Sequence, residues 1–210
     1  MKTLTDDQQR TITRLYEHNQ TFLVGKMGSG KTVCAMTAAQ ELLDAGELTR
    51  ILVVAPLRVC NTVWATECDH WAHLNVEVVA ATGNPRERIQ AIQSDAKIVA
   101  INYESLAWFC ASSYVKEFDG LIIDDISRFR QPGGVEFKAL RKLRSTFVWR
   151  VGMTGTPVTE NWVGLYAQML LVDCGKRLGT NKKKYLLEYF FPTDYEQRNW
   201  ELRLNAADQI

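Results

Sequence analysis

The sequence of 210 residues lacks several features that would each define a class of protein. Its five cysteines are scattered and form no C-x-x-C pair, which excludes a disulfide framework or a zinc knuckle and indicates reduced thiols. Its longest apolar runs, such as residues 51–56, are far shorter than the ~20 residues of a membrane span. The polar N-terminus lacks the apolar stretch of a signal peptide. We therefore expect a cytoplasmic protein that makes no membrane contact.

An excess of charge of one sign is also missing. Lys and Arg total 25 against 24 for Asp and Glu, so no global basic excess indicates nucleic acid, although a local basic face is not excluded. Apolar residues at 46% and charged residues at 23% are typical of a soluble globular protein and exclude disorder. The length fits one large domain, or one domain with a small appendage.

Short β-branched runs alternate with longer amphipathic stretches up to residue 153. The pattern predicts strands at residues 21–25, 50–55, 76–80, 97–101, 120–124 and 149–153. It predicts helices at residues 31–45, 59–71, 85–94, 105–110 and 135–144. Such alternation predicts βαβ units, and therefore an α/β fold in which a parallel sheet is sandwiched between two layers of helices.

The pattern changes after Pro157. Helices are predicted at residues 162–172 and 182–189, and no further strand is expected. We divide the chain into a nucleotide-binding lobe (1–157), a mostly helical extension packed on it (158–197), and a tail or linker (198–210).

The strongest motif is G-K-M-G-S-G-K-T at residues 25–32, a full match to the phosphate-loop pattern G-x-x-x-x-G-K-[ST] between a predicted strand and helix. Its glycines let backbone N–H groups surround phosphate oxygens at a helix N-terminus. In this pattern Lys31 reaches the β- and γ-phosphates and the Thr32 hydroxyl binds Mg²⁺. The candidate nucleotide-binding residues of the loop are Gly25, Met27, Gly28, Ser29, Gly30, Lys31 and Thr32.

Two acids, Asp124 and Asp125, end the apolar strand 120–124. Asp124 is placed to hold Mg²⁺ through water, because ligands bind beyond the carboxyl ends of parallel strands. Asp125 is placed to orient or deprotonate the attacking water. The candidate catalytic residues are thus Lys31, Asp124 and Asp125, and the candidate metal ligands are Thr32 and Asp124.

A third motif, G-M-T-G-T-P at residues 152–157, follows the last predicted strand. Small hydroxyl side chains on a strand-end loop can hydrogen-bond both the acids and a neighbouring chain. Thr154 and Thr156 are the candidates.

The order of these motifs, with A-P-L-R-V at residues 55–59 between them, resembles the first, RecA-like motor lobe of superfamily-2 helicases. It is most similar to Swi/Snf-type translocases, especially small phage-encoded members, and the resemblance continues through residues 161–191. It implies ATP and Mg²⁺ as cofactors, duplex DNA as a partner, and host-cell cytoplasm if the protein is phage-encoded. In the opening L-x-x-x-Q, Gln8 would read the adenine edge.

The resemblance also implies that strand-end loops contact the DNA backbone. The residues carried over are Pro56, Arg58, Thr82, Gly83, Asn102, Tyr103, Thr154 and Thr156. Trp64 belongs to the same segment as Arg58, but its apolar-face spacing favours a core or lobe-packing position.

The sequence departs from the family pattern D-E-x-H, because residues 124–127 read D-D-I-S. Asp125 shortens the expected base by one methylene group. Ser127 in place of His removes a link between the nucleotide and DNA sides.

Family motors hydrolyse ATP between two lobes, and the second lobe supplies arginines worth about 10³–10⁵ in rate in related phosphoryl transfer. Nothing after Pro157 predicts such a lobe, so we expect it in cis or in trans. The chain by itself is predicted to bind Mg²⁺-ATP and to hydrolyse it slowly or not at all, below about 1 s⁻¹.

Two functions stay open: the ATP-binding lobe of a DNA-dependent helicase-like ATPase, and a non-hydrolysing nucleotide-sensing or regulatory lobe that docks a partner protein. A small P-loop kinase or an AAA+ subunit is disfavoured, because the expected lid arginines are missing. The basic residues Arg128, Arg130 and 182–184 remain open between phosphate contacts and solvated surface.

Overall fold

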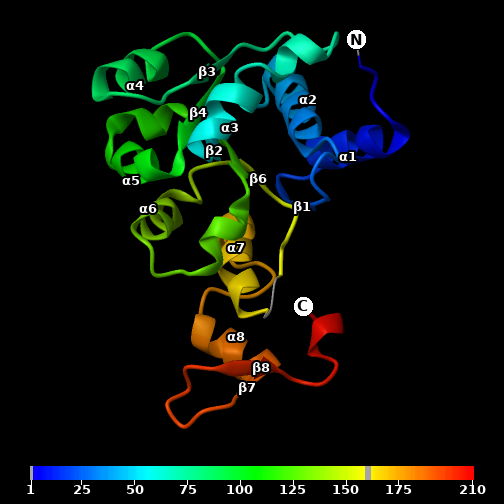
Figure 1. Cartoon of the computed structure of the whole chain (residues 1–210), viewed down its shortest axis with the longest axis vertical. Coiled ribbons are helices and arrows are strands. Elements are labelled where there is room, and N and C mark those ends of the chain that lie inside the picture. Colours follow the sequence, from blue (N-terminus) through cyan, green and yellow to red (C-terminus); the bar gives the residue numbers. More distant parts are fainter. Residues whose placement is uncertain (1, 159–161) are drawn as a thin grey trace.

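The computed structural model describes residues 2–158 and 162–210. Its centre is a six-stranded, all-parallel sheet in the order β1-β6-β5-β2-β4-β3 (Figure 1). The strands are β1 Gln20–Val24, β2 Ile51–Ala55, β3 Val78–Ala80, β4 Ile98–Asn102, β5 Gly120–Asp124 and β6 Trp149–Thr154. The predicted α/β fold with a sandwiched parallel sheet is confirmed, and each predicted strand lies within two residues of its observed bounds.

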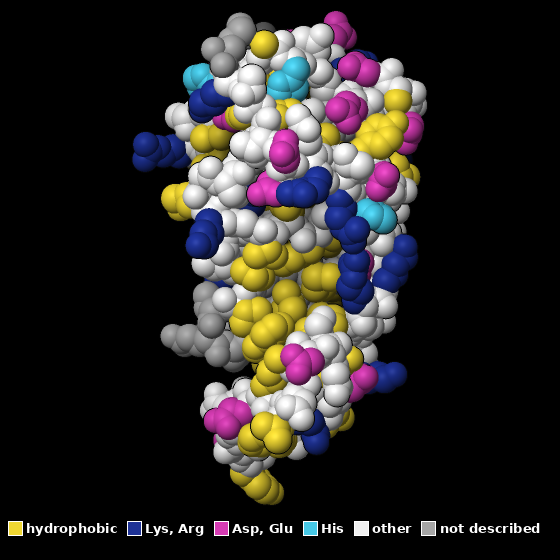
Figure 2. Space-filling view, turned by 90° about the vertical axis from the view of Figure 1, so that its right-hand side faces the viewer, with side chains coloured by type: hydrophobic (Ala, Val, Ile, Leu, Met, Phe, Trp, Pro, Cys, Tyr) yellow, Lys and Arg dark blue, Asp and Glu magenta, His cyan; other side chains and the backbone are white. Residues whose placement is uncertain are grey.

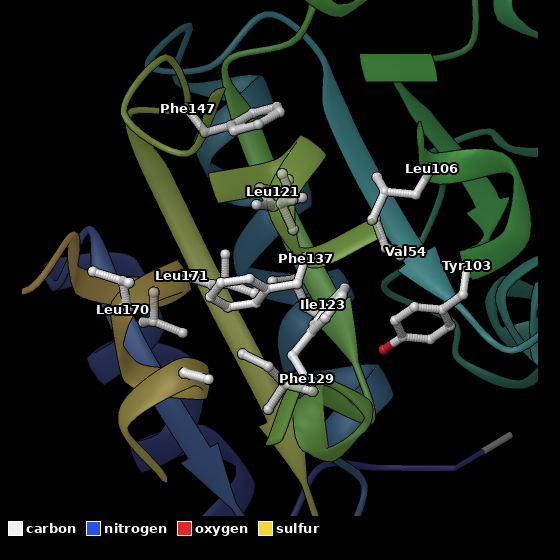
Figure 3. Close-up of a cluster of buried hydrophobic side chains, with 14 of the residues drawn as sticks. Val54, Tyr103, Leu106, Leu121, Ile123, Phe129, Phe137, Phe147, Leu170 and Leu171 are labelled. Atoms are coloured by element: carbon white, nitrogen blue, oxygen red, sulfur yellow. The ribbon is translucent and has the colours of Figure 1, made fainter. Parts of the chain in front are cut away.

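Both faces of the sheet are covered. In β2 every residue is buried, and alternate side chains enter two different hydrophobic clusters: Leu52 and Val54 one, Ile51 and Val53 the other. A strand buried on both faces is expected to be continuously apolar. Figure 3 shows the first cluster, in which aromatic side chains such as Phe137 and Phe147 lie over β5.

Helices form the outer layers. The helices are α1 Asp6–Glu17, α2 Lys31–Asp44, α4 Pro85–Ile92, α5 Tyr103–Ala111, α6 Val135–Leu143, α7 Val163–Asp173 and α8 Lys182–Tyr189. Buried residues of α1 and α2 belong to one cluster, and those of α5, α6 and α7 belong to the other. The two layers therefore hold the sheet between them.

Helix α1 was not among the predicted helices. Thr5 and Gln8 form a capping box at its start, and Ile12 and Leu15 are buried on one face, against α2. Only two of its residues are buried, so its apolar pattern is sparse and the polar capping residues are its clearer signal.

The prediction of one helix over residues 59–71 was wrong. The segment is divided into a short α3 (Leu57–Val59), a π-helix η1 (Cys60–Trp64) and a 3₁₀-helix η2 (Glu67–His70). The hydroxyls of Thr62 and Thr66 donate to the carbonyls four residues earlier, at 2.8 and 2.6 Å. Such back-bonding competes with a regular helix.

The expectation of no strand after Pro157 was also wrong. Strand β7 (Phe190–Pro192) pairs antiparallel with β8 (Trp200–Leu202), and η5 (Ala206–Asp208) follows. Strands of three residues are too short to show an alternating pattern. Together with α8 they form a small unit beside the sheet, at the bottom of Figure 1. The resemblance to Swi/Snf-type translocases was expected to continue over residues 161–191. The first residue of this segment lies outside the described residues.

Strand β1 forms one edge of the sheet, and its residues are only partly buried. Figure 2 faces this side of the molecule and shows hydrophobic side chains gathered where the sheet unit meets the smaller unit. Within residues 2–158 and 162–210, no helix combines the length and apolar character needed to cross a bilayer.

Candidate nucleotide-binding site

The predicted phosphate loop connects β1 to α2 at the carboxyl edge of the sheet. Gly28 and Gly30 have φ angles of 79° and 84°, in the left-handed region that favours glycine. The Gly25 N–H donates to the carbonyl of Thr154 at 3.1 Å, which ties the loop to the end of β6. The backbone N–H groups at the start of α2 therefore face the space beyond the sheet edge.

Lys31 and Gln8 both contact this loop. The Lys31 Nζ donates to the carbonyls of Gly25 and Lys26 at 2.6 and 3.0 Å. The Gln8 Nε2 donates to the carbonyl of Ser29 at 3.4 Å, while its Oε1 accepts from the Thr5 N–H at 2.9 Å. Gln8 thus links α1 to the phosphate loop, so α1 positions one wall of the site.

The two acids lie at the end of β5 but have different surroundings. Asp124 Oδ2 accepts a hydrogen bond from the Trp64 indole Nε1 at 2.9 Å. Asp125 has a φ of 58°, which turns the chain sharply after the strand, and it is exposed. Its Oδ1 accepts from the Ser127 hydroxyl at 2.5 Å and lies 3.5 Å from the Thr154 hydroxyl.

Burial raises the pKa of the Asp124 carboxyl above its ordinary value. The hydrogen bond from Trp64 lowers this pKa, the charge of Asp125 raises it, and the charge of Lys31 lowers it. Asp124 therefore lies where a cation would relieve the cost of holding its charge.

These residues surround one cavity of about 740 Å³. Of the predicted nucleotide, metal and catalytic residues, those that line it are Gln8, Met27, Gly28, Gly30, Lys31, Thr32, Asp124, Asp125 and Thr154. Gly25 and Ser29 belong to the loop but not to this lining. Trp71, Val59 and Val63 give the cavity an apolar wall that the motifs did not predict. A cavity of this size, with a few converging polar groups, is typical of a small-molecule site.

The residues expected to contact DNA follow the same edge of the sheet. Because β2, β4 and β3 are adjacent and parallel, Arg58, Asn102 and Thr82 come from neighbouring strand ends. Arg58, Gly83 and Thr156 are exposed, whereas Thr82 and Asn102 are partly buried and bonded to Asn61 and Glu104. Pro56 and Thr156 also line the cavity described above.

Tyr103 differs from its expected position at the surface. It is 2% exposed, and its hydroxyl reaches from α5 to the end of β5, where it donates to the carbonyl of Asp124 (Figure 3). Thr154 is likewise buried, at 1% exposed, and accepts from the Thr156 N–H. Both side chains support the acidic turn from inside the fold.

Sequence reasoning missed two partners of the acids. The apolar-face spacing of Trp64 favoured a core position and the resemblance placed it in the DNA-side segment; it is fully buried, but neither expectation named its bond to Asp124. Ser127 was read as the loss of a link, yet it bonds Asp125 directly. Ser127 could have been found, because a hydroxyl two residues after an acid can bond it locally. No local signal joins Trp64 to Asp124, which lie 60 residues apart.

The parallel sheet, the G-x-x-x-x-G-K-[ST] loop after β1 and the acidic end of β5 define an α/β RecA-like lobe. Within this class, the model of the SNF2-related domain matches residues 8–197. The chain belongs to the SNF2-related domain family.

Two relatives have similar sequences. Protein p41 of Acyrthosiphon pisum secondary endosymbiont phage 1 is 32% identical over 211 residues, which cover 95% of this chain and 46% of p41. Chromodomain-helicase-DNA-binding protein 8 of Xenopus tropicalis is 26% identical over 174 residues, which cover 75% of this chain and 8% of that protein. The chain thus spans less than half the length of both.

A solved structure has the same fold. The Sulfolobus solfataricus SWI2/SNF2 ATPase core in complex with dsDNA superposes with a TM-score of 0.73 at 24% identity, covering 90% of this chain and 39% of that one. The Sulfolobus solfataricus SWI2/SNF2 ATPase core domain superposes with a TM-score of 0.71 at 22% identity, covering 90% of this chain and 38% of that one. The expected fold, that of a RecA-like lobe of a Swi/Snf-type protein, is therefore confirmed.

Proposed function

We propose that this chain binds Mg²⁺-ATP and acts as the ATPase lobe of a DNA-dependent, helicase-like translocase. The observation that carries the proposal is the convergence of Lys31, Asp124, Asp125 and Thr154 on one cavity at the carboxyl edge of a parallel sheet. These residues come from three separate segments of the sequence, and only the fold brings them together.

The donor set fits a magnesium nucleotide. Magnesium is usually held by one or two carboxylates together with phosphate oxygens and water, and Asp124 and the Thr32 hydroxyl both line the cavity. In the described parts of the chain, no group of three or more His, Cys, Asp or Glu side chains could hold a metal ion by itself. Binding of Mg²⁺ would therefore depend on the nucleotide, and the ion would neutralise charge on the phosphate oxygens.

The protein side chains then have separate roles. Lys31 exchanges its bonds to the Gly25 and Lys26 carbonyls for phosphate oxygens. Asp125 orients the attacking water, while the hydroxyls of Ser127 and Thr154 both contact its Oδ1. The second lobe, in cis or in trans, supplies arginines for the charge of the transition state.

The nucleotide arm of the test uses calorimetry and a steady-state ATPase assay. The unsubstituted chain should bind Mg²⁺-ATP and hydrolyse it below about 1 s⁻¹, and Lys31→Ala should abolish binding. Lys26→Ala is the matched control, because it removes the same charge from an exposed position of the loop. Equal losses in both variants would contradict the assignment of Lys31.

The DNA arm measures binding of a labelled duplex by anisotropy at several salt concentrations. Arg58→Ala should weaken binding and reduce the salt slope by about one, as the loss of one phosphate contact does. Arg10→Ala, at an exposed position on α1, should change neither. If DNA leaves the nucleotide affinity unchanged, both in this chain and in a longer chain that contains a second lobe, the nucleotide-sensing module is favoured instead.

A further inference from the structure

Trp64 is the last residue of the π-helix η1, and it connects this helix to the acidic strand end. The indole ring is 0% exposed, and its Nε1 donates to Asp124 Oδ2 at 2.9 Å. A charged acceptor makes this bond stronger than one between neutral groups. The bond joins two segments that reach the sheet edge from adjacent strands, β2 and β5.

The helix that carries Trp64 is held firmly in place. The Cys60 N–H donates to the Pro56 carbonyl at 3.0 Å, and the Thr62 hydroxyl donates to the Arg58 carbonyl at 2.8 Å. The ring of Trp64 packs in the hydrophobic cluster between η1 and the sheet. A π-helical turn is uncommon and frequently occurs at functional sites. Here it brings the indole N–H to face Asp124.

The bond restricts how the Asp124 carboxylate can turn. With Oδ2 accepting from Trp64, rotation about the last side-chain torsion would break a charged hydrogen bond. The carboxylate also interacts with the backbone N–H of Asp125, and in this orientation Asp124 lines the cavity together with Lys31 and Thr32. Partners of this kind, which orient a ligating carboxylate, typically change metal affinity when they are removed.

We propose that Trp64 is a positioning residue for the magnesium site, because its indole N–H fixes the Asp124 carboxylate in the orientation that receives the ion. This inference rests on the proposed function. It assigns Trp64 to the nucleotide side of the lobe, although its segment was expected at the DNA side.

The test is Trp64→Phe, which removes the N–H and keeps an aromatic ring. Calorimetry measures ATP affinity across a Mg²⁺ series and in EDTA, because loss of a tryptophan would disturb a fluorescence readout. The Mg²⁺ concentration for half-maximal effect should rise about 10–100-fold, as for other partners of metal ligands. The affinity of Trp64→Phe for ATP in EDTA should differ from that of the unsubstituted chain by less than about twofold, which is the ordinary effect of a remote substitution.

The matched control is Trp149→Phe. The Trp149 indole is also buried, at 1% exposed, and donates to the Leu15 carbonyl at 2.9 Å, on a residue of α1 that does not line the cavity. Trp149→Phe also removes a buried indole N–H bond, here to a neutral carbonyl away from the cavity, so it should change the ATP affinity neither with Mg²⁺ nor in EDTA. A second comparison places Trp64→Phe in an Asp124→Asn background, where the substitution should add no further loss if Trp64 acts through the carboxylate.

If Trp64→Phe does not fold, β-(3-benzothienyl)alanine at position 64 replaces the N–H with sulfur at nearly the same size. An unchanged Mg²⁺ dependence in a folded variant would overturn the proposal. Equal losses with Mg²⁺ and in EDTA would also overturn it, because they indicate a collapsed site. Absence of Mg²⁺-dependent ATP binding by the unsubstituted chain would overturn the proposed function, and this inference with it.

Discussion

The single O–H of Tyr103 is shared between the backbone carbonyls of Asp124, at 2.7 Å, and of Asp125, at 3.0 Å. One buried side chain therefore holds the turn that carries both acids. Burial raises the pKa of Tyr103 well above its ordinary value, so the hydroxyl remains a donor throughout the neutral range.

Tyr103→Phe should lower the stability of the lobe. A buried hydroxyl bond contributes about 0.5–1.5 kcal/mol, which corresponds to a decrease in Tm of about 2–4 °C per kcal/mol for a chain of this size. Thermal unfolding followed by circular dichroism measures it. Tyr16→Phe is the control, because it removes an exposed bond to Glu47 and should have little effect. Equal decreases in Tm would contradict the role of Tyr103.

Gly30→Ala should disturb the contact between α1 and the phosphate loop. An added Cβ would lie 2.2 Å from Gln8 Nε2, so Gln8 must move and give up its bonds to Thr5 and Ser29. Loss of a capping contact costs about 0.5–2 kcal/mol, in addition to the strain of a positive φ.

Gly46→Ala is the control for Gly30→Ala. Gly46 has a φ of 73° and no atom within 4 Å of an added Cβ, so this substitution introduces the strain of a positive φ without a steric contact. Denaturant midpoints should show a larger loss at Gly30 than at Gly46. In a Gln8→Ala background, Gly30→Ala should lower the stability no more than Gly46→Ala does. If the effects of Gln8→Ala and Gly30→Ala are instead strictly additive, the contact with Gln8 does not cause the larger loss at Gly30.

Asp124→Asn should stabilise the metal-free chain at neutral pH. The pKa of Asp124 is raised on folding, chiefly by burial, so its charged form opposes folding above that pKa. Below the unfolded-state pKa the carboxyl is protonated in both states and the penalty vanishes. Stabilising substitutions of this kind commonly contribute about 0.5–2 kcal/mol.

The corresponding increase in Tm should be largest near pH 7 and should shrink as the pH falls toward the ordinary range of an aspartate. Calorimetric unfolding of both chains in EDTA between acid and neutral pH measures it. An increase independent of pH would contradict a penalty that arises from the charge.

Arg50→Ala should destabilise the opposite end of the sheet. The guanidinium donates to the carbonyls of Ile92, Ser94 and Ala96 at 2.7–3.1 Å and pairs with Glu117 at 2.7 Å. Removal of these bonds from a side chain that is 13% exposed should cost about 2–4 kcal/mol. Arg10→Ala, which breaks an exposed pair with Asp7, should cost less than about 1 kcal/mol. Urea unfolding compares the two.

The strands and the phosphate loop could be predicted because their signals are local. In β2 the apolar run is continuous, since each residue faces one of the two buried layers. The glycines of the loop directly precede α2, so motif and structure lie within one short segment. Strands β7 and β8 could not be predicted, because each has three residues and their pairing joins segments about ten residues apart.

The sequence by itself determined the class of fold, the phosphate loop and the identity of the two acids, because periodicity and motif spacing express them within a few neighbouring residues. Only the tertiary structure decided how the acids are held. The partner of Asp124 is Trp64, 60 residues away on a π-helical turn, and the support of the acidic turn is Tyr103, 21 residues away on α5. Such contacts depend on strand order and side-chain packing across the sheet edge, which no local pattern of residues encodes.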